Sequence, residues 1–234
     1  QNDKVVVSVF LNPTQFGPTE DLEAYPRDFE ADCKLCESIG AAMVFHPEPS
    51  EMYAPDFCTW VDMDVLSKTL CGKSRPIHFR GVCTVVSKLF NIVTPDRAYF
   101  GQKDAQQLAI IRRMVRDLNM DIEIVGCPIV REEDGLAKSS RNTYLNEEER
   151  KAALILSKAV FLGKKMVEDG ETSAAAVKEA TIKKIESEPM AKIDYVEVVA
   201  GLSMQPVEEI KAPVLVAMAV YIGKTRLIDN FIVE

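Results

Sequence analysis

Three polar loops follow stretches that we expect to be strands, and their side chains are of types that bind small charged ligands. The first loop, NPTQFG, carries two carboxamides, Asn12 and Gln15, that lie three positions apart. Carboxamides donate and accept hydrogen bonds and could therefore bind a small hydroxylated molecule. The alternative is that Asn12 caps the end of the strand while Gln15 faces solvent. The spacing alone leaves both interpretations open.

The second loop, FGQKDAQQL, combines features that suit a phosphate site. Gly101 lets a ligand approach the backbone closely, and Lys103 brings a mobile positive charge. Asp104 stands where the N-cap of a helix is expected, and Gln107 follows one turn later. The alternative is a capped helix with a solvated lysine, and the spacing does not separate the two.

The third loop, DGLAKSSRN, holds hydroxyls and positive charges directly after a flexible Asp-Gly turn. Its polar residues are Lys138, Ser139, Ser140 and Arg141. Hydroxyls, main-chain N–H groups and a guanidinium together can hold phosphate oxygens while charge accumulates on a leaving pyrophosphate. The same residue types are common in linkers, so an interdomain connection is the alternative.

The chain has two histidines, and one of them precedes a long helical pattern. This histidine, His78, could bind a carboxylate or a phosphate together with Arg75 and Arg80, and the alternative is a capping or packing role. The other, His46, stands before a proline at the end of an expected strand, and we expect it to be structural.

The composition is that of an ordinary globular protein. The chain has 234 residues, of which 47% are hydrophobic, and this suffices for one large domain or two modest ones. The formal net charge of -8 gives no general attraction to a phosphate backbone, which disfavours a nucleic-acid partner. No window has the roughly 18 consecutive apolar residues of a membrane span, and the N-terminus lacks the pattern of a signal peptide. We therefore expect a cytoplasmic protein that binds neither membrane nor nucleic acid.

The six cysteines are scattered through the first part of the chain, and none follows Cys127. Such scatter is not typical of the disulfide framework of a small secreted domain. Cys33 and Cys36 have CxxC spacing, but they lie in a helical pattern without a second pair or a histidine at zinc-finger spacing. We expect buried or half-exposed thiols rather than a metal or redox site.

Strands and helices alternate through the first half of the chain. A nearly unbroken β-branched run at 4–11 is typical of a strand that is covered on both faces. Its successors are a helical pattern at 26–38, an apolar run at 41–47, a helix at 79–93, a strand at 97–101, a helix at 104–118 and a strand at 121–130. This order predicts an α/β fold with a mostly parallel sheet, in which ligands bind beyond the carboxyl ends of the strands.

The pattern changes after Asn146. A long helix follows, which Asn146 caps with Glu149 three positions further on, and then come a second helix and three strand candidates. Two helices followed by three strands with short turns predict a small α+β domain. We place the boundary near Asn142, which gives domains 1–142 and 143–234.

The three loops, in this order and spacing, resemble those of the pantothenate synthetase (pantoate–β-alanine ligase) family. The matching strings are NPTQFGPTEDLEAYPRD, RPIHFRGVCTVVSKLFNIVTPD, YFGQKDAQQLAIIRRMV, DGLAKSSRN and RLIDN. The resemblance runs from about Val5 to the C-terminus. It implies a Rossmann-like nucleotide-binding domain with a smaller C-terminal domain that acts as a lid, in an enzyme that is usually a homodimer.

The resemblance also implies a two-step reaction with ATP and Mg²⁺. Pantoate attacks the α-phosphorus of ATP to give pantoyl adenylate and pyrophosphate, and the amine of β-alanine then displaces AMP. Such chemistry depends on positioning and charge neutralisation, for which amides, hydroxyls and cations suffice.

Site residues are carried over position by position from this resemblance. Asn12, Gln15 and Gln107 match the pantoate ligands, and Tyr25 lines the same side. The ATP-contacting loop corresponds to Phe100, Gly101, Lys103 and Asp104.

The serine-rich loop matches the family's counterpart of the KMSKS loop of class I aminoacyl-tRNA synthetases. Ser139, Ser140 and Arg141 then close over the ATP phosphates and act in catalysis together with Lys103. Lys138 stands where the family usually has Met, and this extra cation either strengthens the phosphate contact on the ATP side or simply faces solvent. His78 and Arg80 belong to a β-alanine or phosphate side, and no metal ligand is assigned.

The family begins with a strand, a PTMGxLHxGH loop and a helix, and these residues do not occur in the sequence. We expect that the chain is a portion of a longer enzyme. By itself it should fold poorly or be inactive, since Val5 to Leu11 would present an unpaired apolar edge. A measured mass near 26.1 kDa together with full ligase activity would contradict this expectation.

Two other functions are compatible with the motifs. A degenerate relative would bind pantoate or nucleotide without adenylating, and a related nucleotidyltransferase would act on another acid. The set Asn12, Gln15 and Gln107 argues against the second, because nucleotide binding alone does not require it.

Overall fold

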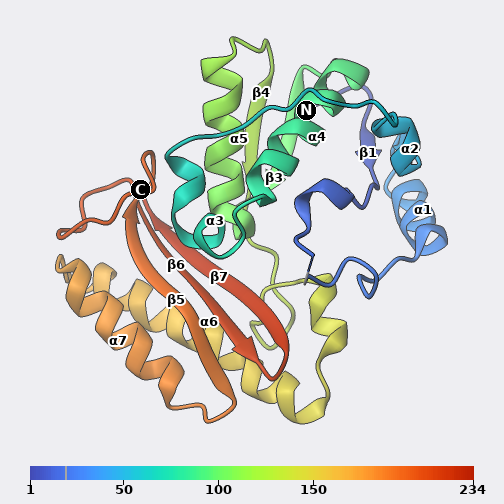
Figure 1. The fold of residues 1–234 in the computed structure, drawn as a ribbon. Coiled ribbons are helices and arrows are strands. Elements are labelled where there is room, and N and C mark those ends of the chain that lie inside the picture. Colours follow the sequence, from blue (N-terminus) through green and yellow to red (C-terminus); the bar gives the residue numbers. More distant parts are fainter. Residues whose placement is uncertain (19) are drawn as a thin grey trace. The chain divides into compact units, whose positions relative to one another are not determined.

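The computed structural model describes residues 1–18 and 20–234, and its contacts divide the chain into two compact units. Unit 1 comprises Gln1–Met63 and Ile77–Asp96, and unit 2 comprises Asp64–Pro76 and Arg97–Glu234. Figure 1 shows the helices and strands of both units. The order of elements is that of an α/β protein with parallel strand pairs and a separate antiparallel sheet.

Unit 1 contains a two-stranded parallel sheet of β1 (Val6–Ser8) and β2 (Met43–Phe45). The predicted parallel arrangement is confirmed, but the expectation that these strands are covered on both faces is wrong. Val6 is 36% exposed and Met43 is 57% exposed. In the part of the chain that the structure describes, β2 is the only strand that pairs with β1, so the apolar run stays half-exposed.

The two helices predicted in unit 1 are present, but the one expected at 26–38 begins three residues later, because Asp28 is its cap. Asp28 caps α1 (Phe29–Ser38), since its Oδ1 accepts a hydrogen bond from the N–H of Ala31 at 3.0 Å. A short helix, α2 (Pro49–Met52), follows β2. The long helix α4 (His78–Val93) buries its apolar residues at helical spacing, among them Phe79, Val82, Cys83, Val86 and Phe90.

Unit 2 begins with short elements, the 3-10 helix η2 (Leu66–Lys68) and α3 (Leu70–Ser74). The strands β3 (Arg97–Gly101) and β4 (Glu123–Cys127) then form a second parallel pair, as predicted. The helix α5 (Ala105–Asp117) connects them and packs on both strands.

The second part of unit 2 is an antiparallel sheet with helices on one face (Figure 1). Its strands are β5 (Ala191–Ala200), β6 (Val214–Ile222) and β7 (Thr225–Val233), in the order β5-β6-β7. The helices are α6 (Glu147–Glu168) and α7 (Ala174–Glu186). The predicted cap is confirmed, because the Asn146 Oδ1 accepts from the N–H of Glu149 at 2.9 Å and Glu149 accepts in return.

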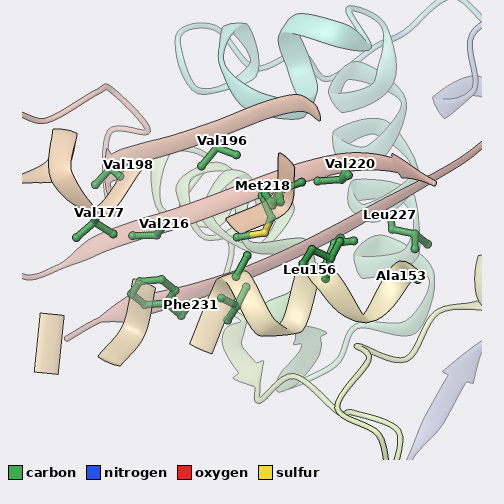
Figure 2. Close-up of a cluster of buried hydrophobic side chains, with 14 of the residues drawn as sticks. Ala153, Leu156, Val177, Val196, Val198, Val216, Met218, Val220, Leu227 and Phe231 are labelled. Atoms are coloured by element: carbon green, nitrogen blue, oxygen red, sulfur yellow. The ribbon is translucent and has the colours of Figure 1, made fainter. Parts of the chain in front are cut away.

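A cluster of buried apolar side chains lies between this sheet and α6 and α7 (Figure 2). Alternate residues of the strands point into it, because successive side chains of a strand face opposite sides. Val216, Met218 and Val220 of β6 and Leu227 and Phe231 of β7 belong to the cluster. Helices α6 and α7 contribute Ala153, Leu156 and Val177. The face of β7 that carries Leu227 and Phe231 is therefore the face toward the helices.

The two units differ in their bounds from the predicted domains 1–142 and 143–234. Residues 97–142 belong to the same compact unit as the antiparallel sheet. Side chains of β7 contribute to this, because they bind the loops after β3 and β4, as described below. The predicted domains, in the sense of separately acting parts, stay a prediction.

All six cysteines are free thiols. No group of His, Cys, Asp and Glu within residues 1–18 and 20–234 is placed to hold a metal ion without other ligands. None of the described helices is long and apolar enough to cross a membrane.

The thiols are expected to differ widely in reactivity. Cys58 is exposed, whereas Cys83 is fully buried in α4, and burial raises the pKa of the Cys83 thiol to about 12. Because the thiolate is the nucleophile, iodoacetamide at pH 8 should alkylate Cys58 first and leave Cys83 unmodified until the protein is denatured. Peptide mass spectrometry measures both, and equal rates for the two thiols would contradict this packing of α4.

Candidate active site

The NPTQ residues of unit 1 form a short 3-10 helix, η1 (Pro13–Gln15). Asn12 caps it, since Asn12 Oδ1 accepts from Thr14 Oγ1 at 2.9 Å and from the N–H of Thr14 at 3.4 Å. Proline suits the first position of such a turn because its ring fixes φ and it lacks an N–H. Asn12 thus caps η1 rather than the end of the strand, and its predicted role at a pantoate site stays a prediction.

The carboxamide of Asn12 is 2% exposed and is engaged entirely within unit 1. Its Oδ1 also accepts from Tyr53 Oη at 2.7 Å, and burial raises the pKa of that phenol. Its Nδ2 donates to Gly81 O at 3.2 Å and to Gln15 Oε1 at 3.3 Å. Asn12 thus fixes the turn and orients Gln15, whose side chain is half-buried.

The first turn of α4 packs directly against η1. His78 Nδ1 lies 3.0 Å from Gln15 O, and His78 is 8% exposed. Gly81 follows on the same face, and a Cβ there would lie 2.5 Å from Thr14 O and 2.7 Å from Gln15 Cα. Only glycine allows the turn to approach the helix this closely. Gln15 therefore contacts two other predicted residues. Its side chain is hydrogen-bonded to Asn12, and its carbonyl lies next to the ring of His78.

Tyr25 and Arg80 make aromatic contacts in unit 1 that the sequence did not indicate. The ring of Tyr25 meets Phe16 edge to face, with centroids 6.0 Å apart. The exposed Arg80 places its guanidinium carbon 4.5 Å from the centre of the Trp60 ring. This cation–π contact holds the Arg80 side chain against the surface.

The second predicted loop lies in unit 2 at the carboxyl end of β3. Gly101 ends the strand, and η3 (Gln102–Asp104) leads into α5. Lys103 is half-buried, and its ammonium group forms no ion pair with any residue that the structure describes. Asp104 occupies the N-cap position of α5, as predicted, but its side chain makes no capping hydrogen bond. Both charged groups thus remain available to a ligand.

The other two predicted residues of this loop, Phe100 and Gly101, differ in burial. Phe100 is a half-buried residue of β3, whereas Gly101 is exposed, and a Cβ at Gly101 would meet nothing within 4 Å. The surrounding protein does not demand glycine at this position. The open space is what a ligand near the backbone needs.

The two adjacent glutamines at the start of α5 have opposite roles. Gln106 is 5% exposed, and its Nε2 donates to Leu66 O at 2.8 Å and to Thr69 O at 2.7 Å. Gln107 is only half-buried, and its carboxamide makes no hydrogen bond to another described residue. Of the two, Gln107 therefore has the carboxamide that is available to a ligand, and its role in binding pantoate stays a prediction.

The serine-rich loop follows a tight turn that begins at Arg131 and closes by a bridge between Arg131 and Ala137. Gly135 makes this turn possible, with φ +95. The N–H of Lys138 donates to Val130 O at 2.9 Å, and the Lys138 side chain is exposed. Residues 131–137 thus form a short hairpin that leads into the serine-rich loop.

Ser139 begins a 3-10 helix, η4 (Ser140–Tyr144), and caps it by accepting from the N–H of Arg141 at 3.3 Å. Ser140 is exposed and Arg141 half-buried. The structure therefore places Lys138, Ser139, Ser140 and Arg141 in one compact turn at the entrance to α6. Hydroxyls, N–H groups and cations lie together there, as a phosphate clamp requires.

An ionic network holds this hairpin to α6. Arg150 Nη2 lies 2.8 Å from Glu132 Oε2 and 2.6 Å from Asp134 Oδ2, and Asn142 Nδ2 donates to Glu132 Oε1 at 2.7 Å. The hydrogen bond from Asn142 and then the one from Arg150 lower the pKa of Glu132, and Arg150 lowers that of Asp134. This support for the hairpin is present at neutral pH and is lost as acid protonates the two carboxylates.

Two adjacent residues of β7 bind the loops of unit 2, and sequence analysis assigned them no role. Asn230 Nδ2 donates to Lys103 O at 2.8 Å and to Gln102 O at 3.1 Å. Asp229 accepts from Arg131 Nη1 at 2.7 Å and Nη2 at 2.9 Å. The sequence did carry a sign of such a role, since Asp229 and Asn230 are consecutive polar residues within a largely apolar strand. It did not indicate which residues they would bind.

Comparisons with known proteins agree with one another. A family model described as Pantoate-beta-alanine ligase matches residues 1–232. A pantothenate synthetase of Ruminiclostridium cellulolyticum is 66% identical over 233 residues, covering 99% of this chain and 82% of that protein. One of Clostridioides difficile is 61% identical over 234 residues, with 100% and 83% covered.

Solved structures of the same kind are also similar. A pantothenate synthetase from Thermus thermophilus has a TM-score of 0.95 at 44% identity, covering 98% of this chain and 83% of that chain. A pantoate-beta-alanine ligase from Francisella tularensis, described as complexed with beta-gamma ATP and beta-alanine, has a TM-score of 0.78 at 30% identity, with 99% and 80% covered.

Proposed function

The chain belongs to the pantoate–β-alanine ligase family, and we propose on this basis that it joins pantoate to β-alanine with ATP as the energy source. In the first step a carboxylate oxygen of pantoate attacks the α-phosphorus of ATP, and the bond to the β-phosphate oxygen breaks to release pyrophosphate. In the second step the amine of β-alanine attacks the acyl carbon, loses a proton and displaces AMP. The product is pantothenate.

The observation that carries this proposal most directly is the half-buried, unpaired Lys103 in the turn after β3. A lysine with no carboxylate partner among the described residues keeps its full charge for an anionic ligand. We assign it to the ATP phosphates, where it opposes the charge that develops on pyrophosphate. Gly101 gives the nucleotide access to the backbone, and Phe100 fixes the end of the strand.

The residues at the start of η4, Ser139, Ser140 and Arg141, form the proposed clamp on the leaving phosphates. The guanidinium of Arg141 can bind two phosphate oxygens at once, and the serine hydroxyls can donate to them. The exposed Lys138 adds a further positive charge. Because the clamp precedes α6, we propose that the part from 143 to 234 acts as a lid, which moves together with the Lys103 turn to which Asn230 of β7 is hydrogen-bonded.

The pantoate ligands are proposed to be Gln15, which Asn12 orients, and Gln107, whose carboxamide has no partner among the described residues. Asn12 contributes by holding Gln15 through the 3.3 Å hydrogen bond, so its role is positioning. Tyr25 belongs to the same side. His78 and Arg80 remain candidates for the β-alanine or phosphate side.

Mg²⁺ is a proposed cofactor, and Asp104 fits it. The carboxylate of Asp104 is exposed, makes no capping hydrogen bond and follows Lys103 directly. Mg²⁺ is commonly bound by one or two carboxylates together with phosphate oxygens and water, so a single carboxylate beside the phosphates is a suitable donor set. When bound, the ion would neutralise phosphate charge.

We further propose that the protein is a homodimer in the cytoplasm.

Exchange of radioactive pyrophosphate into ATP tests the function. The exchange should occur with pantoate and should be absent without it, because only formation of the adenylate is reversible in this way. A protein that binds ATP and pantoate but shows no exchange would be a non-catalytic relative. Exchange driven by another carboxylic acid in place of pantoate would identify a different nucleotidyltransferase.

Gln107→Ala should chiefly weaken pantoate binding. The side chain is half-buried and makes no hydrogen bond within the described protein, so its removal costs a ligand contact and little stability. One lost hydrogen bond to a charged ligand is worth about 1.5 to 3 kcal/mol, or roughly 10- to 150-fold in the Kd of pantoate.

Calorimetric titration with pantoate measures this, and Gln205→Ala is the matched control. Gln205 is an exposed glutamine outside every loop assigned to the site. An unchanged Kd in Gln107→Ala would remove this residue from the pantoate ligands.

A further inference from the structure

The strand β7 carries a pair of adjacent polar residues that are almost completely buried. Asp229 is 2% exposed and Asn230 is 3% exposed, in a strand whose other buried residues are largely apolar. Burying a carboxylate and a carboxamide is unfavourable unless they gain good partners. The partners of these two side chains lie in two loops outside the sheet.

Asn230 binds the Lys103 turn. Its Nδ2 donates to both Gln102 O and Lys103 O, the carbonyls of the two peptide bonds that flank Lys103. Two hydrogen bonds from one amide fix the path of the backbone there. The Lys103 side chain itself has no such tether among the described residues, so its position depends on the backbone that carries it.

Asp229 binds the hairpin that leads to the serine-rich loop. Its carboxylate makes a two-pronged ion pair with Arg131, whose Nη1 also donates to Gly135 O at 3.1 Å. The Asp229 side chain is 1% exposed, so this pair is screened little by water. The N–H of Asn230 donates to Asp229 Oδ1 at 2.8 Å and links the two residues.

The two residues act on opposite faces of one strand. Side chains alternate along a strand, so Asp229 shares the face of Leu227 and Phe231, which pack toward α6, and Asn230 points the other way. A single strand therefore reaches the hairpin from one face and the Lys103 turn from the other.

We propose that Asp229 and Asn230 are positioning residues for adenylate formation, which hold Lys103 and the serine-rich loop in fixed places. This inference rests on the proposed function. Asn230 acts through the backbone of the Lys103 turn, and Asp229 acts through Arg131. A catalytic group misplaced by about 1 Å can lose roughly 100-fold in rate, so loss of the Asn230 amide should lower the rate about 10- to 100-fold.

The test compares Asn230→Ala and Asn230→Asp with the control Thr181→Val in the intact chain. Aspartate has the shape of asparagine, but its carboxylate cannot donate to two carbonyls. Thr181 is fully buried in α7 and donates to Val177 O at 2.8 Å, so Thr181→Val also removes a buried bond to a carbonyl, but one within α7 and outside the loops assigned to the site. Three quantities are measured: the single-turnover rate of pantoyl-adenylate formation, the Tm, and hydrogen exchange of the 97–108 segment.

Both Asn230 variants should form adenylate about 10- to 100-fold more slowly and should exchange faster in 97–108, while Thr181→Val lowers only the Tm. A wild-type rate in Asn230→Asp overturns the inference, and so does unaltered exchange in 97–108. If the wild-type protein forms no adenylate, the proposed function fails instead. The exchange measurement then still decides whether Asn230 anchors the turn, with faster exchange supporting the anchor and unaltered exchange overturning it.

Discussion

Lys103→Ala is expected to lower the single-turnover rate of pantoyl-adenylate formation about 100- to 1,000-fold, which is the range for removal of one group that stabilises transition-state charge. The reason is that the ammonium group sits in the turn after β3 without an ion-pair partner in the described chain, and no other residue of that turn carries a positive charge. The Tm should change little, because a half-buried lysine without partners contributes little to packing.

Rapid quenching of one enzyme equivalent with ATP and pantoate measures the rate directly. Lys211→Ala is the matched control, since Lys211 is an exposed lysine whose side chain is 76% accessible and pairs only with Glu209 among the described residues. Lys103→Arg should recover part of the rate by restoring charge with a different shape. If Lys103→Ala forms adenylate as fast as the wild type, Lys103 has no part in the first step.

Gly81→Ala is expected to have the largest effect on stability. A Cβ at position 81 would lie 2.5 Å from Thr14 O, 2.6 Å from Thr14 C and 2.7 Å from Gln15 Cα. These are backbone atoms, which cannot rotate away as a side chain can. Overpacking typically destabilises by about 1 to 3 kcal/mol, and a clash with backbone belongs at the upper end of that range.

The same change should weaken pantoate binding, because the displaced turn carries Gln15 and its support Asn12. Chemical denaturation and pantoate titration measure the two effects. The control is Asn91→Ala, an exposed position of the same helix α4, where alanine should be neutral or slightly stabilising. A Gly81→Ala protein as stable as the wild type would show that η1 does not pack against α4 as described.

The elements that depend on local sequence were the most predictable. The strand 97–101 and the cap of α6 at Asn146 lie where their residues indicated, because a short aromatic run and a capping box act within a few residues. The burial of β1 was not predictable in the same way. A run of valines shows that a strand can be covered, but the cover depends on neighbours that lie far away in the sequence.

Among the site residues, too, positions set by local sequence were predictable and contacts between distant residues were not. Gly101, Lys103 and Asp104 lie at the carboxyl end of a parallel strand, which the α/β pattern predicts. That Asn12 would be engaged by Tyr53, Thr14 and Gly81 could not be inferred, since Tyr53 and Gly81 are distant in sequence. The roles of the two polar residues in the RLIDN motif were hidden for the same reason, because their partners lie about 100 residues or more away (98 for Arg131 and 127 for Lys103).

The anchoring of the Lys103 turn by β7 has a consequence for synthesis on the ribosome. Asn230 follows Lys103 by 127 residues, so the turn is made long before the amide that holds it. At about 5 to 20 residues per second, the interval is roughly 6 to 25 s. During that time the parallel pair β3 and β4 can form, but the turn beyond it has no anchor. The loops proposed to bind phosphate should therefore become ordered only when the last strand is in place, and a nascent chain stalled before Thr225, the first residue of β7, should not yet bind nucleotide.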